Sequence, residues 1–499
     1  MESKATPTEP GAGASAPGAG VPTSRVAALT RVVSAALAPV DLAWLAAFRV
    51  LFGLTMAVSM LRFIANGWID RFFVTPRFFF KYWGFEWVQA GSAAEMHLLF
   101  VALTALALSI AAGALFRVTS LLFALGLGYV QLIDVSTYLN HYYLAALLAF
   151  LLAASPANRI WSVDAWLRER SRQLRGLPAL PRTASSARAW LWLFRFQVGL
   201  VYVFAGLAKA QSDWLCHAQP LRIWLGANTE LPLIGPLLAL PGVPLVMSWC
   251  GFLFDTTVVA FLLHARTRRY AYVVVILFHT LTRVLFPIGM FPVIMVLAAL
   301  VFFPPDWPRP WLARLARALG KRIAVPAAAA PSSATAPSRW VQLPLAVGGA
   351  YCLLQLALPL RYLAYGGNVL WHEQGMRFSW RVMIRAKGGS TTFVVKNKQT
   401  GHVAYVNPRV YLTGLQESEM SSQPDLILQL AHHIRDDFAE RGLGPVEVRA
   451  DSRVALNGRR SAVFLDPKVD LVNLHDGFGL ASLVLPAPAE PPAHTRPVL

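Results

Sequence analysis

The side chains best suited to chemistry lie in residues 197–214, where an apolar segment runs into a lysine. Tyr202, Ala205, Gly206 and Lys209 recur at helical spacing, so one helix face presents a phenol, two small residues and an amine. An amine in a low-dielectric pocket is favoured in its neutral form and can act as a general base. Because a membrane pocket also dissolves apolar molecules, the predicted chemistry is proton abstraction from a lipid-soluble acid such as a hydroquinone.

Structural roles are open for the same residues. A lysine at the end of a membrane helix commonly extends to the lipid headgroups, which is the simplest alternative for Lys209. Asp213 follows Lys209 by one helical turn, so an ion pair between the two is a second alternative. These readings predict a lysine without a catalytic role.

Further polar side chains are expected at the same depth, on the outer half of the membrane part. Asn140 and His141 begin one apolar segment, and His279 and Arg283 share a face near the end of another. Ionisable groups at membrane depth are costly and normally face a protein interior or a wet cavity. Taken singly, His141 can be a hydrogen bonder at a helix start and His279 a partner of Arg283. Their coincidence predicts a shared pocket.

The composition places the chain among membrane proteins. Of its 499 residues 56% are hydrophobic and only 14% are charged, with a mean hydropathy of +0.48. The net charge of +19 comes from basic residues in short loops between apolar segments, which argues against a nucleic-acid partner. Cys216, Cys250 and Cys352 have no metal-type spacing, and no metal site or nucleotide-binding motif is predicted.

The apolar segments predict an α-helical polytopic membrane protein of about nine spans, which is embedded in the lipid bilayer. The spans are expected at 42–64, 97–115, 118–133, 138–155, 190–208, 245–264, 270–286, 288–304 and 341–359. With nine spans, every cluster of arginines falls on the side of the N-terminus, so the N-terminus is predicted to be cytoplasmic. Lys209 and everything after the last span then lie on the outer side.

The chain divides into six predicted parts. They are a disordered segment (1–38), a transmembrane domain (39–322), a cytoplasmic linker (323–340), the last span (341–360), an outer α+β domain (361–487) and a tail (488–499). In the outer domain, residues 391–406 predict a hairpin and residues 424–439 an amphipathic helix. Short strands are expected at 446–450 and 462–466, and no cleavable signal peptide is evident.

Eight short stretches give the chain a family resemblance. They are FRVLFGLTM (48–56), DVSTYLNHYYLAALLAF (134–150), IWSVDAW (160–166), VYVFAGLAKAQSDW (201–214), FHTLTRVLFPIGMF (278–291), FSWRVM (378–383), GHVAYVNPRV (401–410) and FLDPKVDLV (464–472). In this order they resemble the vitamin K-dependent γ-glutamyl carboxylases, whose membrane part is called the HTTM domain. The Ala- and Arg-rich composition fits a shorter bacterial homologue with a periplasmic outer domain.

The resemblance implies an enzyme that uses reduced vitamin K, oxygen and carbon dioxide to convert protein glutamate to γ-carboxyglutamate. Lys209 matches the family's catalytic lysine and would deprotonate the hydroquinone, which leaves as its epoxide. His141 matches an active-site histidine, and His279 another histidine of the membrane core. The quinone pocket would be lined by these residues together with Asn140, Tyr202 and Arg283.

The resemblance also implies the remaining partners. Phe378, Ser379 and Trp380 match a segment linked to the glutamate substrate and would line the peptide site. Oxygen supplies the energy, so no biotin, nucleotide or metal is implied. A Glu-containing protein is the expected substrate, and a quinone reductase would recycle the epoxide.

Departures from the family pattern leave the substrate open. Residues 373–377 differ from the animal enzymes, and the chain ends soon after the last matching stretch, without a cysteine pair for their interdomain disulfide. One alternative is therefore a quinol epoxidase or monooxygenase that does not carboxylate protein. Another is a non-enzymatic scaffold or transporter in which Lys209 reaches the headgroups, although no internal inverted repeat is seen.

Overall fold

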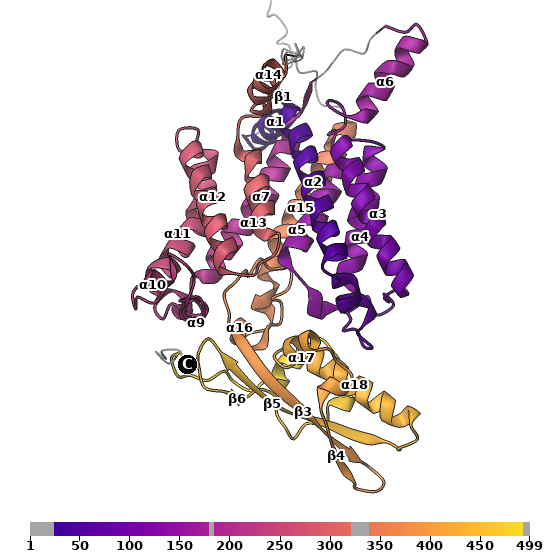
Figure 1. The fold of residues 1–499 in the computed structure, drawn as a ribbon, viewed down its shortest axis with the longest axis vertical. Helices are drawn as coiled ribbons and strands as arrows, with labels where there is room; N and C mark the ends of the chain where they lie inside the picture. The colour runs from indigo at the N-terminus through magenta and orange to yellow at the C-terminus, as the bar shows by residue number, and fades with distance from the viewer. Residues whose placement is uncertain (1–23, 179–183, 321–338, 493–499) are drawn as a thin grey trace, which may run out of the picture.

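The computed structural model describes residues 24–178, 184–320 and 339–492, which form a helical part above a small α+β part (Figure 1). The helices of the first part are α1 (Ser24–Leu37), α2 (Ala43–Ala65), α3 (Ala93–Ala112), α4 (Phe116–Ile133), α5 (Asn140–Ala154), α6 (Val163–Leu174), α7 (Arg188–Lys209), α8 (Ser212–Leu215), α9 (Leu221–Gly226), α10 (Gly235–Leu238), α11 (Val243–Leu263), α12 (Arg268–Leu285), α13 (Phe291–Ala298) and α14 (Pro308–Ala318). Strands β1 (Pro39–Asp41) and β2 (Ser185–Ala187) pair antiparallel at the end far from the α+β part.

Six helices of the described residues are long and apolar enough to cross a membrane. They are α2, α3, α4, α7, α11 and the segment Leu343–Ala364, which begins within α15 (Arg339–Leu360). Two further apolar helices, Asn140–Ala154 and Phe291–Phe302, are shorter, and α12 carries Arg268 and Arg283. The protein is therefore a mostly helical, multi-pass membrane protein, while the number nine stays a prediction.

A buried arginine fixes the contact between α2 and α3. Arg49 donates hydrogen bonds to the carbonyls of Ile110 and Ala111 at the end of α3, at 3.0 and 2.9 Å. Carbonyls in the last turn of a helix lack the usual i+4 donor, and the guanidinium also complements the negative end of the helix dipole. Gly113 then ends the helix with a left-handed φ of 70°.

The predicted disorder of residues 1–38 is corrected for part of its length, because residues 24–37 form α1. Its sequence SRVAALTRVVSAAL repeats apolar side chains at helical spacing, and the helix contacts α7. Residues 1–23 of that segment lie outside the described residues. So do residues 323–338 of the predicted linker and residues 493–499 of the predicted tail.

The α+β part contains one antiparallel sheet of order β4-β3-β5-β6 and two covering helices. Its elements are α16 (Val369–His372), β3 (Lys387–Asn397), β4 (Val403–Val406), α17 (Gly414–Met420), α18 (Pro424–Glu440), β5 (Val446–Leu456) and β6 (Ala462–Val463). The predicted hairpin is confirmed by the pairing of Phe393 with Val406, and the predicted amphipathic helix is α18. Strand β5 is longer than predicted, because it pairs with β3 along its whole length.

The core of this part lies between α18 and one face of the sheet. Alternate residues of β5, from Val446 to Leu456, are buried, as are Leu426, Leu430 and Ile434 of α18. Polar contacts join the two parts of the protein: the Gln416 side chain of α17 donates to the Asp134 carboxylate, at 2.7 Å, after the end of α4. The sheet is thereby held against the membrane part.

Candidate functional site

Close packing of α7 on α11 creates the centre of the site. A Cβ atom added to Gly206 would lie 2.7 Å from Thr256 Cγ2 and 2.9 Å from the Thr256 backbone nitrogen, so only glycine allows this approach. Small residues at helix contacts let membrane helices pack backbone to backbone. Lys209, one turn further along α7, is thereby brought beside Asp255 of α11.

Lys209 is a buried ion-pair partner. Its Nζ lies 2.7 Å from Asp255 Oδ2, and only 7% of each side chain is exposed. The amine also donates to the Ala205 carbonyl at 3.3 Å and lies 5.1 Å from the centroid of the Trp214 ring. The alternative in which Lys209 extends to the headgroups does not describe this geometry.

Asp213 does not form the predicted pair with Lys209. Its carboxylate accepts two hydrogen bonds from Arg459, at 2.6 and 2.7 Å, and one from Asn457 at 2.9 Å. The helix ends at Lys209, so the helical spacing that predicted the pair no longer applies at Asp213. The carboxylate partner of Lys209 is therefore Asp255.

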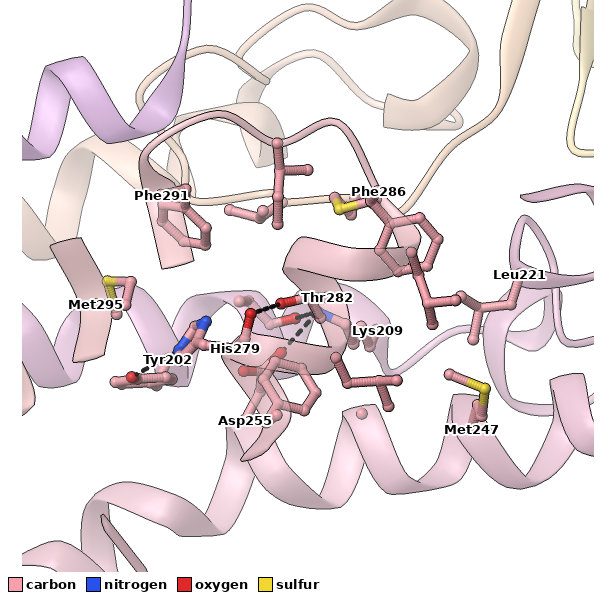
Figure 2. A pocket seen from close by; sticks show the side chains of 18 of the residues that line it. Tyr202, Lys209, Leu221, Met247, Asp255, His279, Thr282, Phe286, Phe291 and Met295 are labelled. Carbon is pink, nitrogen blue, oxygen red and sulfur yellow. Dashed lines mark hydrogen bonds and ion pairs between the residues drawn. The ribbon is translucent and has the colours of Figure 1, made fainter. Parts of the chain in front are cut away.

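Tyr202 and His279 form a second pair on the same wall, shown in Figure 2. The Tyr202 hydroxyl lies 3.1 Å from His279 Nε2, and both residues are buried. His279 Nδ1 is also buried and has no hydrogen-bond partner among the described residues. Arg283 differs: it is exposed and donates to the Gly289 carbonyl at 2.9 Å, so the alternative pairing of His279 with Arg283 is replaced by the pairing with Tyr202.

These side chains surround an apolar cavity of about 100 Å³. The polar groups are Lys209, Asp255, Tyr202, His279 and Thr282, whereas most of the lining is aromatic or aliphatic. The apolar lining includes Trp214, Leu221, Trp224, Met247, Phe278, Leu285, Phe286, Phe291, Met295, Val382 and Met383. A few polar groups converging in an apolar cavity are typical of a small-molecule site.

His141 and Asn140 lie beside this cavity rather than in its lining. The buried His141 ring contacts Phe291, whose ring also contacts His279, with centroid separations of 6.4 and 6.1 Å. Asn140 accepts a hydrogen bond from the Tyr138 hydroxyl at 3.0 Å. Asn140 lines a second chamber, which is described next. The single pocket predicted from the sequence therefore corresponds to two neighbouring sites.

The second site is a chamber of about 560 Å³ between the membrane part and the α+β part. Its charged lining residues are Glu373, Arg377, Arg381, Arg385 and Glu419. Met383 and Trp224 line both this chamber and the apolar cavity. Residues 381–385 therefore form the partition between them.

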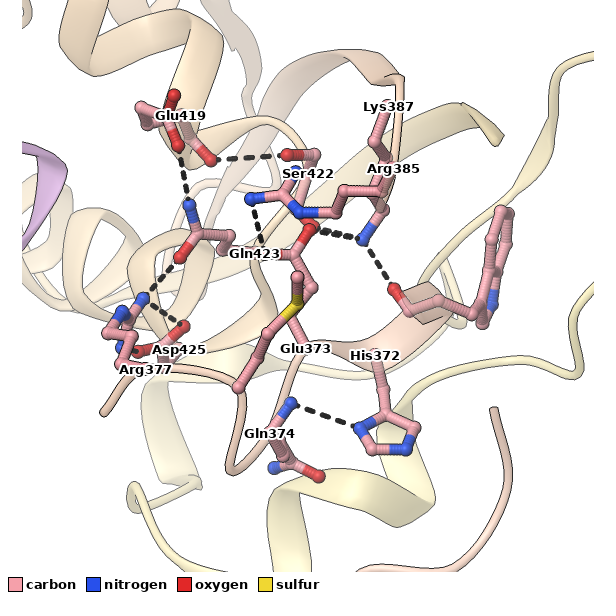
Figure 3. Close-up of polar contacts among 12 residues, drawn as sticks. His372, Glu373, Gln374, Arg377, Arg385, Lys387, Glu419, Ser422, Gln423 and Asp425 are labelled. Atoms are coloured by element: carbon pink, nitrogen blue, oxygen red, sulfur yellow. Dashed lines mark hydrogen bonds and ion pairs between the residues drawn. The ribbon is translucent and has the colours of Figure 1, made fainter. Parts of the chain in front are cut away.

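The charges around the chamber are mostly paired (Figure 3). Arg377 contacts Asp425 at 2.6 Å, and Glu373 binds both Arg385, at 2.8 Å, and Lys387, at 3.1 Å. Burial raises the pKa of Glu419, which favours its neutral form.

Arg381 differs from the other two chamber arginines. Among the described residues it has no carboxylate partner, and its guanidinium lies 4.0 Å from the centroid of the Tyr362 ring. A half-buried guanidinium without a carboxylate partner is suited to an anionic ligand.

The predicted peptide-site residues Phe378, Ser379 and Trp380 support the chamber but do not line it. Trp380 is fully buried and stacks on Tyr143 with the ring centroids 4.9 Å apart, and the Phe378 backbone nitrogen donates to the Tyr138 hydroxyl at 2.9 Å. The neighbouring residues on either side face the chamber instead.

The sequence-based prediction missed Asp255 and Arg381, which line these sites, and the contacts of Asn457 and Arg459 with Asp213. Asp255 carries a usable signal, since a carboxylate inside the apolar segment GFLFDTTVV is costly unless it is paired. Asn457 and Arg459 carry none, because nothing in a soluble-looking loop indicates contact with a membrane helix end.

Comparison with known families agrees with this division. The family profile of the HTTM domain matches residues 37–307, and the profile of the lumenal domain of vitamin K-dependent gamma-carboxylase matches residues 340–490. The ion pair of the apolar cavity lies in the first match, and the chamber arginines lie in the second. No solved structure matches the chain.

Proposed function

Because the chain belongs to the vitamin K-dependent γ-carboxylase family, we propose that it is an integral membrane γ-glutamyl carboxylase. It couples the oxygenation of a vitamin K-type hydroquinone to its epoxide with the carboxylation of protein glutamate. The observation that carries this proposal is the buried Lys209–Asp255 pair in an apolar cavity that shares a wall with an arginine-lined chamber.

The apolar cavity fits the head of a hydroquinone. Its walls are aromatic and aliphatic, and His279 offers a buried Nδ1 that has no hydrogen-bond partner in the described part of the chain and can bind a phenolic oxygen. When bound, reduced vitamin K supplies, through its reaction with oxygen, the energy and the strong base needed to remove a glutamate γ-proton. The protein's own residues position the phenol and exclude water.

Lys209 is the proposed base for the phenolic proton. Asp255 Oδ2 lies 2.7 Å from Nζ and is the proposed acceptor for a proton of the lysine, since a carboxylate at this distance can take it directly. The Nζ lone pair is then free to take a proton from a phenol. The resulting ammonium is held by the Ala205 carbonyl and the Trp214 ring as well as by Asp255.

The chamber is the proposed entry for the glutamyl side chain. Arg381 is the proposed partner of its carboxylate, and Met383 and Trp224, which line both spaces, mark where the glutamyl γ-carbon would meet the apolar cavity. This chamber favours carboxylation over the epoxidase-only alternative, which requires no site for an acidic peptide. The predicted Phe378, Ser379 and Trp380 act by holding this wall, while His141 supports the cavity through Phe291.

We further propose that the N-terminus is cytoplasmic and the α+β domain lies on the outer side. The arrangement in Figure 1 supports this, since the arginine-rich helices α6 and α14 lie at the end opposite the α+β domain. A Glu-containing protein is the proposed substrate, carbon dioxide the carbon source, and a quinone reductase the partner that recycles the epoxide.

The test uses purified full-length protein in detergent with reduced vitamin K, labelled bicarbonate and a short Glu-containing peptide. We expect wild type to form epoxide and fix label, and Lys209→Ala to lose both by about 10²–10⁴-fold, as for removal of a general base. Lys398→Ala, in the β3–β4 turn, is the matched control and should retain activity. Epoxide without fixed label would reduce the proposal to a quinol epoxidase. No product from several quinols and peptides would overturn it in favour of a scaffold or transporter.

A further inference from the structure

The turn between β5 and β6 reaches from the outer domain to the end of α7. Arg459 forms a bidentate ion pair with Asp213, at 2.6 and 2.7 Å, and Asn457 Nδ2 adds a hydrogen bond of 2.9 Å to the same carboxylate. Asn457 is fully buried, and 13% of the Arg459 side chain is exposed. A bidentate guanidinium–carboxylate pair fixes orientation as well as distance.

The ionised form of Asp213 is the one that this contact holds. Burial raises the pKa of Asp213, but the hydrogen bonds from Arg459 and Asn457 more than offset that effect, so the pKa lies below its ordinary value. The contact is therefore intact throughout the neutral range.

Asp213 in turn fixes the residue that covers Lys209. The next residue, Trp214, lines the apolar cavity, and its ring centroid lies 5.1 Å from Lys209 Nζ. Its indole nitrogen donates to the Ser248 carbonyl at 2.8 Å, which ties it to α11 as well. Movement of Asp213 would move the aromatic face that lies against the lysine amine.

The same turn is tied to the partition between cavity and chamber. Asn457 exchanges two hydrogen bonds with Ala386: its backbone nitrogen donates to the Ala386 carbonyl at 2.8 Å, and its Oδ1 accepts from the Ala386 nitrogen at 2.9 Å. Ala386 directly follows the partition residues 381–385. Asn457 therefore contacts both the end of the partition and the Asp213 carboxylate.

We propose that Arg459 and Asn457 are positioning residues for Lys209, acting through Asp213 and Trp214, and that they link a peptide in the chamber to the base in the cavity. This role rests on the proposed function, because it presupposes that Lys209 is the base. The positioning contacts themselves are additional to the chemical steps of that reaction. The physical basis is a contiguous set of directional contacts from the partition to the lysine.

The kinetic experiment compares Arg459→Met, Asp213→Asn and the double variant in full-length protein. We expect each single variant to lower the kcat of epoxide formation about tenfold, with the KM for the hydroquinone changed less than about threefold, because the cavity keeps its lining. The double variant should be no slower than either single variant, since both remove one shared contact. Arg459→Lys should recover part of the rate, and a Glu-containing peptide should stimulate epoxidation less in the Met variant than in wild type.

Arg441→Met is the matched control, because Arg441 pairs with Asp437 at the C-terminal end of α18. It should leave kcat unchanged. Additive losses in the double variant, or equal losses in Arg441→Met, would show a general effect on folding and overturn the proposal.

Hydrogen exchange gives a readout that does not depend on activity. In Arg459→Met the amides of residues 205–216 should exchange faster than in wild type, while the core of β5 keeps its protection. Unchanged exchange in residues 205–216 would overturn the positioning role even if wild type has no carboxylase activity. If wild type is inactive and exchange rises as expected, the contact stands and the proposed function fails.

Discussion

Two buried lysine–carboxylate pairs occupy the two parts of this protein, and their surroundings differ. Lys209 of the membrane part binds Asp255 at 2.7 Å and faces a cavity, with a carbonyl only at 3.3 Å. Lys387 of the outer domain binds Glu373 at 3.1 Å and also donates to the carbonyls of Trp371 and Ser422. No part of the Lys387 side chain is exposed.

The difference lies in how fully each amine is satisfied. An ammonium has three donors, and those of Lys387 are met by one carboxylate and two carbonyls, which leaves no direction for a ligand. Lys209 has one strong partner and an aromatic face, with a cavity beside it. Burial alone therefore does not mark a reactive lysine, whereas an incomplete set of partners beside a cavity does.

The largest effect is expected at Asp255, the carboxylate partner of Lys209. Asp255→Asn should lower both epoxide formation and carbon dioxide fixation about 10²-fold, because it removes the group that exchanges a proton with Lys209 and holds the ammonium. The exposed Asp451→Asn on β5 is the control and should be indistinguishable from wild type. Full activity in Asp255→Asn would mean that Lys209 works without its partner.

The second pair should respond in the opposite way. Lys387→Met leaves two buried carbonyls and part of the Glu373 carboxylate without a donor, so we expect it to destabilise the outer domain by about 3 kcal/mol. Thermal unfolding in detergent measures this loss. Lys209→Met, measured in parallel, should lower the unfolding temperature less, because the Asp255 carboxyl can be neutralised by a proton whereas the Trp371 and Ser422 carbonyls cannot. A larger loss of stability from Lys209→Met would invert the comparison.

The sequence predicted much of the fold because the fold depends on local pattern. Each of the nine apolar segments overlaps a helix, and the amphipathic spacing of Leu426, Leu430 and Ile434 identified α18 within one residue of its ends. The number of spans could not be predicted as securely. Helix α5 has only 15 residues and α12 carries several charges, so neither meets the requirement for a span by length and hydropathy.

The site was only half predictable. Tyr202 and Lys209 are neighbours on one helix, so their spacing placed them on one wall of the cavity. Asp255 and Arg459 come from other elements and meet α7 only through tertiary packing, which the spacing along one helix cannot report. The proximity of Asp213 in sequence was misleading for the same reason, because the chain leaves the helix between the two residues.

Glu373 of the second pair also distinguishes two of the chamber arginines. Glu373 engages Arg385, whereas Arg381 has no carboxylate partner among the described residues. Arg381→Gln should therefore raise the KM for a Glu-containing peptide about tenfold, since one charge-assisted hydrogen bond to a carboxylate is lost, and should leave peptide-independent epoxide formation unchanged. Peptide titrations at saturating hydroquinone measure this; an unchanged KM would remove Arg381 from the peptide site.

The smallest expected effect is a change in the free energy of unfolding with pH that comes from Lys387. Burial lowers the pKa of Lys387 to about 8, against about 10.4 for a lysine in the unfolded chain. Between these values the unfolded chain binds more protons than the folded protein, so this lysine makes the free energy of unfolding rise with pH and that gain is lost as pH falls through about 8. From pH 8 to 9 the gain is roughly 1 kcal/mol. The unfolding temperature of wild type relative to Lys387→Met should therefore increase over this interval. If the difference between the two proteins does not change with pH, Lys387 remains charged in the folded protein, and its Glu373 and carbonyl contacts outweigh the cost of burial.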